Sequence, residues 1–318
     1  MRRKIIAFLA LTSGLPALGV GIFFVGVRHV PLQIPEDQRP PAALTQPNGG
    51  LTVRYLGVSG YEVSDGKTVV LLDPTPTRPS PSALLTGPLV PDEEYGAKQC
   101  PRADFILVNH SHYDHALDVP AIALRTKAKV LGSPSTVNLA LSRGVPAEQT
   151  QVVKPGDHLI LGTFTVDVRS SRHTDIAGMS QPMGGVTPAD AGPLWFWQFK
   201  LDETLAYRLE ANGTSIWFHP TSTFARGEVG GPAAANLIVG VTGEKATRQK
   251  VDGLLAEAKP LRVLPTHYDN FFQPMQKGLA QMPGFDLAGP RQLFLEANPA
   301  LTWITLDYDQ PLYLPPDP

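Results

Sequence analysis

Cysteine is almost absent from this sequence, since Cys100 is the only one among 318 residues. A single cysteine excludes an intramolecular disulfide and any zinc site built from several cysteines. The chain also lacks an excess of charge of either sign, with a formal net charge of −2 at pH 7. General affinity for nucleic acid needs clustered lysine and arginine, and no run of these residues is longer than Arg2-Arg3-Lys4. We therefore expect no nucleic-acid partner.

The sequence has no internal repeat at solenoid spacing. Charged residues make up 18% and apolar residues 42%, which is ordinary for a globular protein and excludes wholesale disorder. Proline and glycine are abundant, with 32 and 29 residues, and this indicates many turns. Such a composition favours a sheet-rich protein over a helical bundle.

One long uncharged stretch, from Ile5 to Val27, follows the N-terminal cations. It is long enough for the ~20 residues with which a helix crosses a membrane, and the cations would hold the N-terminus in the cytoplasm. We therefore predict that residues 1–30 anchor the protein to a membrane, the bacterial inner membrane, with the folded domain in the periplasm. A signal segment that exports the protein is the alternative interpretation. A buried helix is a third, although its glycines disfavour it.

Downstream of this stretch the sequence predicts a linker over residues 31–50, which are rich in proline without periodicity, and one domain over residues 51–318. The dipeptide Asn212-Gly213 predicts a hairpin turn. In both halves of the domain strands alternate with helices, which predicts sheets covered by helices on their outer faces. Strands are expected at 51–56, 68–72, 104–108, 129–131, 159–168, 194–209, 215–218, 234–241 and 261–264, and helices at 119–128, 136–143 and 246–258.

A dense group of potential metal ligands follows the predicted strand 104–108. Within six consecutive residues stand His110, His112, Asp114 and His115. Neutral imidazole nitrogens and carboxylate oxygens are the ligands of zinc and similar dications. A tight turn after a buried strand can direct His110 and His112 into one pocket and the other two toward a neighbouring position. A lone histidine is more often a core or surface residue, but a group this dense predicts a metal site.

The motif His110-x-His112-x-Asp114-His115 resembles the signature of the metallo-β-lactamase superfamily. The resemblance covers about residues 51–308. It implies an α+β fold, a four-layer αβ/βα sandwich of two mixed sheets with helices outside. The segments Leu-Asp-Pro and Pro-Thr-His-Tyr-Asp are most similar to the branch that contains ascorbate-6-phosphate lactonase and N-acyl-phosphatidylethanolamine phospholipase D.

Further segments resemble the superfamily's other motifs. Asp73, in Leu72-Asp73-Pro74, stands where the family has an aspartate that supports the site without binding metal. His173 and His267 stand at the positions of two further ligands. The resemblance implies two metal positions, the first held by His110, His112 and His173, and the second by Asp114, His115 and His267. Asp114 would also accept a proton from the nucleophilic water.

The function implied by the resemblance is hydrolysis of an ester, lactone or phosphodiester in a small-molecule or lipid substrate. The implied cofactor is one or two zinc ions, with iron or manganese as alternatives. Two other functions stay open: a non-catalytic member of the fold that binds metal or ligand, and an iron-dependent oxidoreductase on the same ligands.

One segment departs from the family pattern. The fourth motif normally reads Gly-Asp-Thr, and its aspartate bridges two metals, but the segment from Ile216 to Phe224 contains no carboxylate. His219 or Thr221 stands nearest the missing aspartate. A hydroxyl carries no charge and cannot bridge two dications as a carboxylate does. We therefore expect the second metal to bind more weakly than the first, or not at all.

Two remaining groups each allow two interpretations. His158 lies in a turn that enters a strand, and we interpret it as structural or exposed rather than as a ligand. Trp195, Phe196 and Trp197 form either a substrate wall or part of the core.

Overall fold

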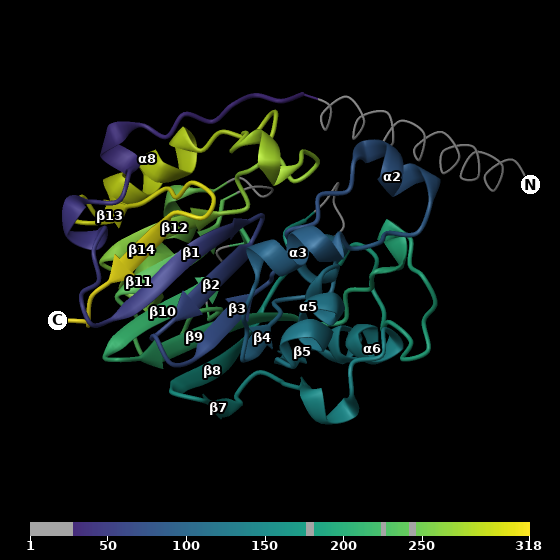
Figure 1. Cartoon of the computed structure of the whole chain (residues 1–318). Helices are drawn as coiled ribbons and strands as arrows, with labels where there is room; N and C mark the ends of the chain where they lie inside the picture. Colours follow the sequence, from purple (N-terminus) through teal and green to yellow (C-terminus); the bar gives the residue numbers. More distant parts are fainter. Residues whose placement is uncertain (1–27, 176–180, 224–226, 242–245) are drawn as a thin grey trace, which may run out of the picture.

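The computed structural model describes residues 28–175, 181–223, 227–241 and 246–318. Within these residues the strands form two seven-stranded sheets that pack face to face (Figure 1). The first sheet has the order β14 (Pro311–Leu314), β1 (Leu51–Gly57), β2 (Gly60–Ser64), β3 (Val69–Leu72), β4 (Phe105–Leu107), β5 (Lys129–Gly132) and β6 (Thr150–Val152). The second has the order β13 (Thr302–Trp303), β12 (Arg262–Thr266), β11 (Asn236–Gly240), β10 (Thr214–His219), β9 (Thr204–Ala211), β8 (Phe164–Ser171) and β7 (His158–Leu161).

The two sheets share one pattern of strand pairing. In the first sheet β14, β1, β2 and β3 pair antiparallel, and β3 to β6 pair parallel. In the second sheet β7 to β10 pair antiparallel, and β10 to β13 pair parallel. Both sheets are therefore mixed, and the predicted αβ/βα sandwich is confirmed. The carboxyl ends of parallel strands lie at one edge of a sheet, which is where α/β proteins place their binding loops.

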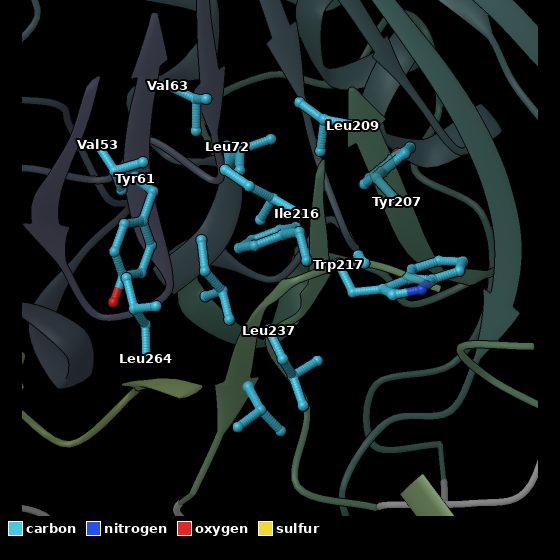
Figure 2. Packing of buried hydrophobic residues seen from close by; sticks show 14 of the residues in the cluster. Val53, Tyr61, Val63, Leu72, Tyr207, Leu209, Ile216, Trp217, Leu237 and Leu264 are labelled. Atoms are coloured by element: carbon cyan, nitrogen blue, oxygen red, sulfur yellow. The ribbon is translucent and has the colours of Figure 1, made fainter. Parts of the chain in front are cut away.

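Alternating apolar side chains build the layers. Along β3, Val70 and Leu72 belong to the core between the sheets, whereas Val69 and Leu71 belong to the cluster beneath the helices on the outer face. Figure 2 shows the inner core, where Leu72 of the first sheet lies close to Ile216 of the second. The first sheet is covered by α2 (Pro81–Thr86), α3 (Glu93–Gln99), α5 (Val119–Thr126) and α6 (Pro134–Ser142), and the second by α7 (Arg248–Ala258) and α8 (Ala288–Ala297).

Two predicted strands differ from the structure. Residues 159–168 are part of the β7–β8 hairpin, which turns at Gly162 with φ +62, and a Cβ at Gly162 would collide with the side chain of Thr68. Residues 194–203 precede β9 and contain the short 3-10 helix η4 (Phe196–Gln198). Their aromatic side chains pack in tertiary contacts, which override the strand propensity of such residues. The predicted hairpin at Asn212-Gly213 is confirmed, since it joins β9 and β10.

Residues 31–50, interpreted from the sequence as a linker, lie against the domain. Leu32 donates its backbone N–H to Leu279 at 3.0 Å, and Gln38 accepts the N–H of Thr305 at 2.8 Å. Leu44 is buried in the main core. The segment includes the 3-10 helices η1 (Glu36–Gln38) and η2 (Ala42–Leu44). Such isolated contacts leave no periodicity in the sequence. A proline-rich stretch that packs against a domain therefore has the same sequence pattern as a linker.

The predicted location of the protein requires correction. No helix in the part of the chain that the structure describes is long and apolar enough to cross a membrane. A catalytic domain held outside the cytoplasm by a membrane anchor, or exported, is therefore not supported by the fold. The stretch Ile5 to Val27, on which that prediction rested, lies outside the described residues.

Candidate metal centre

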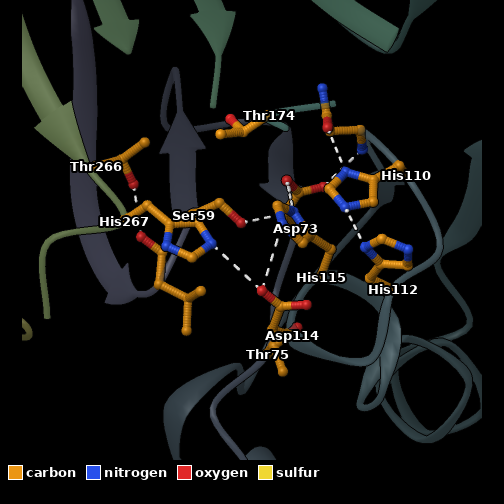
Figure 3. Close-up of polar contacts among 12 residues, drawn as sticks. Ser59, Asp73, Thr75, His110, His112, Asp114, His115, Thr174, Thr266 and His267 are labelled. Atoms are coloured by element: carbon orange, nitrogen blue, oxygen red, sulfur yellow. Dashed lines mark hydrogen bonds and ion pairs between the residues drawn. The ribbon is translucent and has the colours of Figure 1, made fainter. Parts of the chain in front are cut away.

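The loops that follow β4, β8 and β12 bring six polar side chains from distant parts of the chain to one place. Two groups form, and each could hold a metal ion: His110, His112 and His173 in the first, and Asp114, His115 and His267 in the second. In each group, one ligand atom from every residue lies within 4.8 Å of the others. The groups adjoin each other, because the ring centroids of His110 and His115 are 3.9 Å apart. All six residues predicted as ligands are thus brought together. Figure 3 shows all of them except His173.

The residues of the motif reach these positions through local structure. β4 ends at Leu107, and the short helix α4 (Tyr113–Ala116) starts directly after His112. The extended backbone at His112, with φ −62 and ψ 155, separates its side chain from those of Asp114 and His115 in the first turn of α4. This strand–turn–helix transition is why one short segment serves both groups.

Hydrogen bonds determine which nitrogen of His110 carries its proton. Asn109 donates its side-chain amide to the carbonyl of Leu205, so the amide oxygen faces His110. The Nδ1 atom of His110 donates to that oxygen at 2.6 Å. In the neutral ring, Nε2 of His110 therefore carries a lone pair. The sequence offers no indication of this role for Asn109, because its partner Leu205 is 96 residues away.

Backbone carbonyls orient the other two histidines of the first group. Nε2 of His112 donates to the carbonyl of Pro182 at 3.1 Å, and Nδ1 of His173 donates to the carbonyl of Thr174 at 2.6 Å. A carbonyl oxygen can only accept, so the remaining nitrogens, Nδ1 of His112 and Nε2 of His173, carry lone pairs. Hydrogen bonds of this kind are the usual support of metal-binding imidazoles.

The first group has the donor chemistry that a zinc-type dication requires. Nε2 of His110 and Nδ1 of His112 lie 3.1 Å apart with a lone pair on each, a repulsive arrangement that a cation between them would relieve. Burial lowers the pKa of all three rings, to about 3 for His112 and about 4 for His173, and well below the ordinary value for His110, with neighbouring histidines adding to the effect. At neutral pH the three rings are therefore uncharged and could each act as a ligand.

The second group centres on the carboxylate of Asp114. Its Oδ2 atom lies 3.3 Å from Nε2 of His267 and 3.7 Å from Nε2 of His115. Burial opposes ionisation of Asp114, but His115 and His267 outweigh it and hold the carboxyl pKa below its usual range. Burial likewise lowers the pKa of His115, but the carboxylates of Asp73 and Asp114 more than offset it, so that the net shift is upward. One carboxylate and two imidazoles fit a second dication.

Asp73 belongs to neither group but supports both through hydrogen bonds. Its Oδ1 accepts the backbone N–H of Asn109 at 2.6 Å, and its Oδ2 accepts Nδ1–H of His115 at 2.7 Å. The hydroxyl of Ser59 lies 2.9 Å from the same nitrogen of His115. Asp73 itself has φ +42, a left-handed conformation that is uncommon outside glycine and typical of functional loops.

The turn between β1 and β2 holds the loop of His267. The carbonyl oxygen of Val58 accepts the backbone N–H of His267 at 2.5 Å and the hydroxyl of Thr266 at 2.7 Å. Val58 has φ +54, a costly conformation for a β-branched residue, and His267 has φ +63. Asp269 stabilises this arrangement by accepting the N–H of Val58 at 2.8 Å. Nothing in the sequence pattern points to Val58 as a support.

The loop after β10, where the bridging aspartate is missing, contains a buried polar network. Nε2 of His219 donates to Oε2 of Glu228 at 2.8 Å, and the hydroxyl of Thr223 donates to the same oxygen at 2.7 Å. The hydroxyl of Ser171 lies 3.3 Å from Nε2 of His219 and 3.3 Å from the hydroxyl of Thr221. A Ser–His–Glu catalytic triad needs the serine and the carboxylate on different nitrogens of the histidine ring. Ser171 and Glu228 both contact Nε2 of His219, so these three residues do not form one. Sequence reasoning missed Glu228, a buried carboxylate nine residues after His219.

A cavity of about 420 Å³ opens beside His173. Its lining is polar and carries the carboxylates of Asp175, Asp202 and Glu203 against the single guanidinium of Arg172. His158 lies elsewhere, on the exposed face of β7, where Nδ1 is 2.8 Å from Oδ1 of Asp167. It belongs to neither group, in agreement with its structural interpretation.

Two facing αβ layers with a histidine-rich centre at their shared edge define the metallo-β-lactamase class of fold. The family model described as "Beta-lactamase superfamily domain" matches residues 68–268, more than half of the chain. The chain therefore belongs to the β-lactamase superfamily, of the metallo-β-lactamase fold.

Curated relatives of this chain are named as metal-dependent hydrolases. A "UPF0173 metal-dependent hydrolase" from Anaeromyxobacter dehalogenans is 31% identical over 159 residues, 46% of this chain and 54% of the relative. Another, from Cupriavidus necator, is 26% identical over 246 residues, 74% of this chain and 79% of the relative. The chain spans about half the length of the first curated relatives it matches.

A solved structure supports the same fold. Igni18, described as a novel metallo hydrolase from Ignicoccus hospitalis, superposes with a TM-score of 0.50 at 15% identity. The alignment covers 84% of this chain and 96% of that protein. At this identity the likeness concerns the fold alone.

Proposed function

We propose that this protein is a metal-dependent hydrolase of carboxylic esters or lactones. The proposal rests mainly on one observation. Nε2 of His110 and Nδ1 of His112, each with a lone pair, lie 3.1 Å apart, and His173 belongs to the same group. A cation between the two nitrogens would stabilise this arrangement. The names of the curated relatives support the same reaction class.

In this proposal His110, His112 and His173 hold one ion, and Asp114, His115 and His267 hold a second. When bound, zinc-type dications supply a water nucleophile that ionises near neutral pH and an electrophile for the substrate's oxygen. Asp114 stays ionised and is partly exposed, so its carboxylate can accept the nucleophile's proton. Asn109 and Asp73 keep the imidazoles in the tautomers that ligation requires.

The charge beside the centre favours an uncharged substrate. Three carboxylates and one guanidinium line the cavity next to His173, and Glu203 in this lining has a pKa raised by burial and by Asp202. A negative potential in this cavity repels an anionic phosphodiester but not an uncharged ester or lactone. Phosphodiesters are therefore the second substrate class of the proposal.

A metal and activity panel tests the proposal. The purified chain is stripped with a chelator, reloaded with zinc, iron or manganese, and assayed on aryl esters, a lactone and a phosphodiester. We expect zinc-dependent turnover of the ester or lactone. Binding of metal with no turnover of any substrate would instead support a non-catalytic binding protein, and iron-specific oxygen consumption would support an oxidoreductase.

A further inference from the structure

Aromatic side chains lie directly beside the second ligand group. The ring of Phe271 stands edge-on to the imidazole of His267, with centroids 5.3 Å apart and an interplanar angle of 86°. Phe272 follows, with its centroid 4.6 Å from that of Phe271. Both phenylalanine rings are only half-buried. An apolar surface therefore begins at a residue of the proposed metal centre and remains partly open.

The loop that precedes β9 places further aromatic side chains beside the ligand motif. Phe196 packs edge-on to Tyr113, the residue between His112 and Asp114, at 6.5 Å. Phe196 and Phe272 pack against the same buried cluster, to which Tyr113 belongs. The exposed ring of Trp197 lies 5.0 Å from Phe196. We call Phe271, Phe272, Phe196 and Trp197 the aromatic strip.

The strip differs from core packing in its exposure. The ring of Phe199, which also contacts Tyr113, is 2% exposed and belongs to the core. The residues of the strip are half-buried, and Trp197 is 44% exposed. Apolar surface that stays in contact with water is available to bind an apolar ligand group.

The two sides of the centre therefore differ in polarity. The side of His173 opens into a cavity with an excess of carboxylates, whereas the side of His267 borders the aromatic strip. A substrate with a polar and an apolar part can bind favourably in only one orientation, in which the apolar part lies toward His267. This asymmetry restricts the occupant of the strip to an uncharged, apolar substituent.

We propose that the aromatic strip binds the apolar acyl chain of an ester or lactone substrate and selects for longer chains. This inference rests on the proposed function, since it names the substrate class of the same site. Each methylene removed from water strengthens binding by about fourfold when fully buried and by less on a half-open surface. The strip therefore discriminates by chain length rather than by hydrogen bonds.

A binding experiment tests the strip without any turnover. Acetate, butyrate and octanoate are titrated into the zinc-loaded full chain by calorimetry. We expect octanoate to bind at least about tenfold more tightly than acetate. Phe271→Ala and Phe272→Ala should each remove most of this advantage and leave acetate unchanged. Phe285→Ala, which changes a partly exposed phenylalanine that is not part of the strip, is the matched control.

The wild-type chain alone can overturn the inference, so it does not depend on the variants folding. Equal affinities for acetate and octanoate would overturn it, as would an equal loss of octanoate binding in Phe285→Ala. A second arm compares p-nitrophenyl acetate with p-nitrophenyl octanoate, for which we expect kcat/KM to rise with chain length. If binding depends on chain length but neither ester is hydrolysed, the strip's role in binding acyl chains stands and the proposed hydrolase function is rejected. If both esters are hydrolysed at rates that do not depend on chain length, the hydrolase function stands and the role of the strip is rejected.

Discussion

Oδ1 of Asp269 accepts the backbone N–H of Val58 at 2.8 Å, and this hydrogen bond joins the β1–β2 turn to the loop that carries His267. The other carboxylate oxygen accepts the hydroxyl of Tyr308 at 2.7 Å and lies 3.6 Å from the guanidinium of Arg78. Asp269 is fully buried. The position of a proposed ligand in the second group thus depends on a carboxylate that belongs to neither ligand group.

Asp269→Asn should therefore weaken the second metal site. The amide keeps one acceptor but loses the charge opposite Arg78, so we expect a loss of stability of about 2–4 kcal/mol. Displacement of the His267 loop should raise the dissociation constant of the second zinc by about tenfold or more, as for other residues that orient ligands. Urea unfolding and zinc titration measure the two effects. Asp309→Asn, which changes a half-exposed partner of Arg54, is the control. Equal zinc affinities in both variants would contradict a positioning role.

Loss of a ligand from the first group should abolish metal binding there. His112→Ala and His173→Ala each remove one of three converging nitrogens, and we expect a large fall in zinc content and loss of hydrolysis. His158→Ala should leave both unchanged, because His158 is exposed and pairs only with Asp167 among the described residues. Elemental analysis of the purified variants makes the comparison. A similar loss in all three would show that the site is misassigned.

Restoring a carboxylate after β10 should tighten the second site. Two neighbouring dications repel each other, and the segment from Ile216 to Phe224 supplies no aspartate to bridge them. Wild-type protein should therefore show one tight and one weak zinc site. His219 is committed to Glu228 at 2.8 Å, which leaves Thr221 as the position to change. Thr221→Asp should lower the dissociation constant of the second zinc ion. Thr221→Asn should not, because asparagine has the shape of aspartate but no charge. Two equally tight sites in the wild type would refute the expectation.

Asp118 should make the stability of the fold depend on pH. Burial raises the pKa of its carboxyl to about 7, against the opposing effect of hydrogen bonds from Thr77. The folded chain therefore holds a proton that the unfolded chain releases near pH 4, so stability falls as pH rises from about 4 to about 7 and is constant above. The full effect is about 4 kcal/mol at most.

The matched variant is Asp118→Asn, which keeps an acceptor for Thr77 and cannot ionise. Between pH 5 and pH 8 the wild type should lose about 2–3 kcal/mol more than this variant, because all other titrating groups are common to both. Urea unfolding at the two pH values gives the difference. Parallel pH profiles would mean that Asp118 is ionised in the fold across this range.

Much of the centre was predictable because it is encoded locally. His110, His112, Asp114 and His115 lie within six residues at the end of a buried strand, and a strand followed by a tight turn directs such side chains into one place whatever the rest of the chain does. Apolar patterns likewise predicted β1, β3, β4 and β5, and the dipeptide Asn212-Gly213 predicted the β9–β10 hairpin. Strand, turn and ligand spacing depend on near neighbours, which the sequence shows directly.

Tertiary structure alone decided the features that depend on distant partners. The tautomers of His110 and His112 depend on the carbonyls of Leu205 and Pro182, and the loop of His267 depends on the strained turn at Val58. These contacts arise from the register of strands and the course of loops, which no local pattern records. The same holds for the exposure of an aromatic run: its residues and order are in the sequence, but whether water reaches them depends on what packs above.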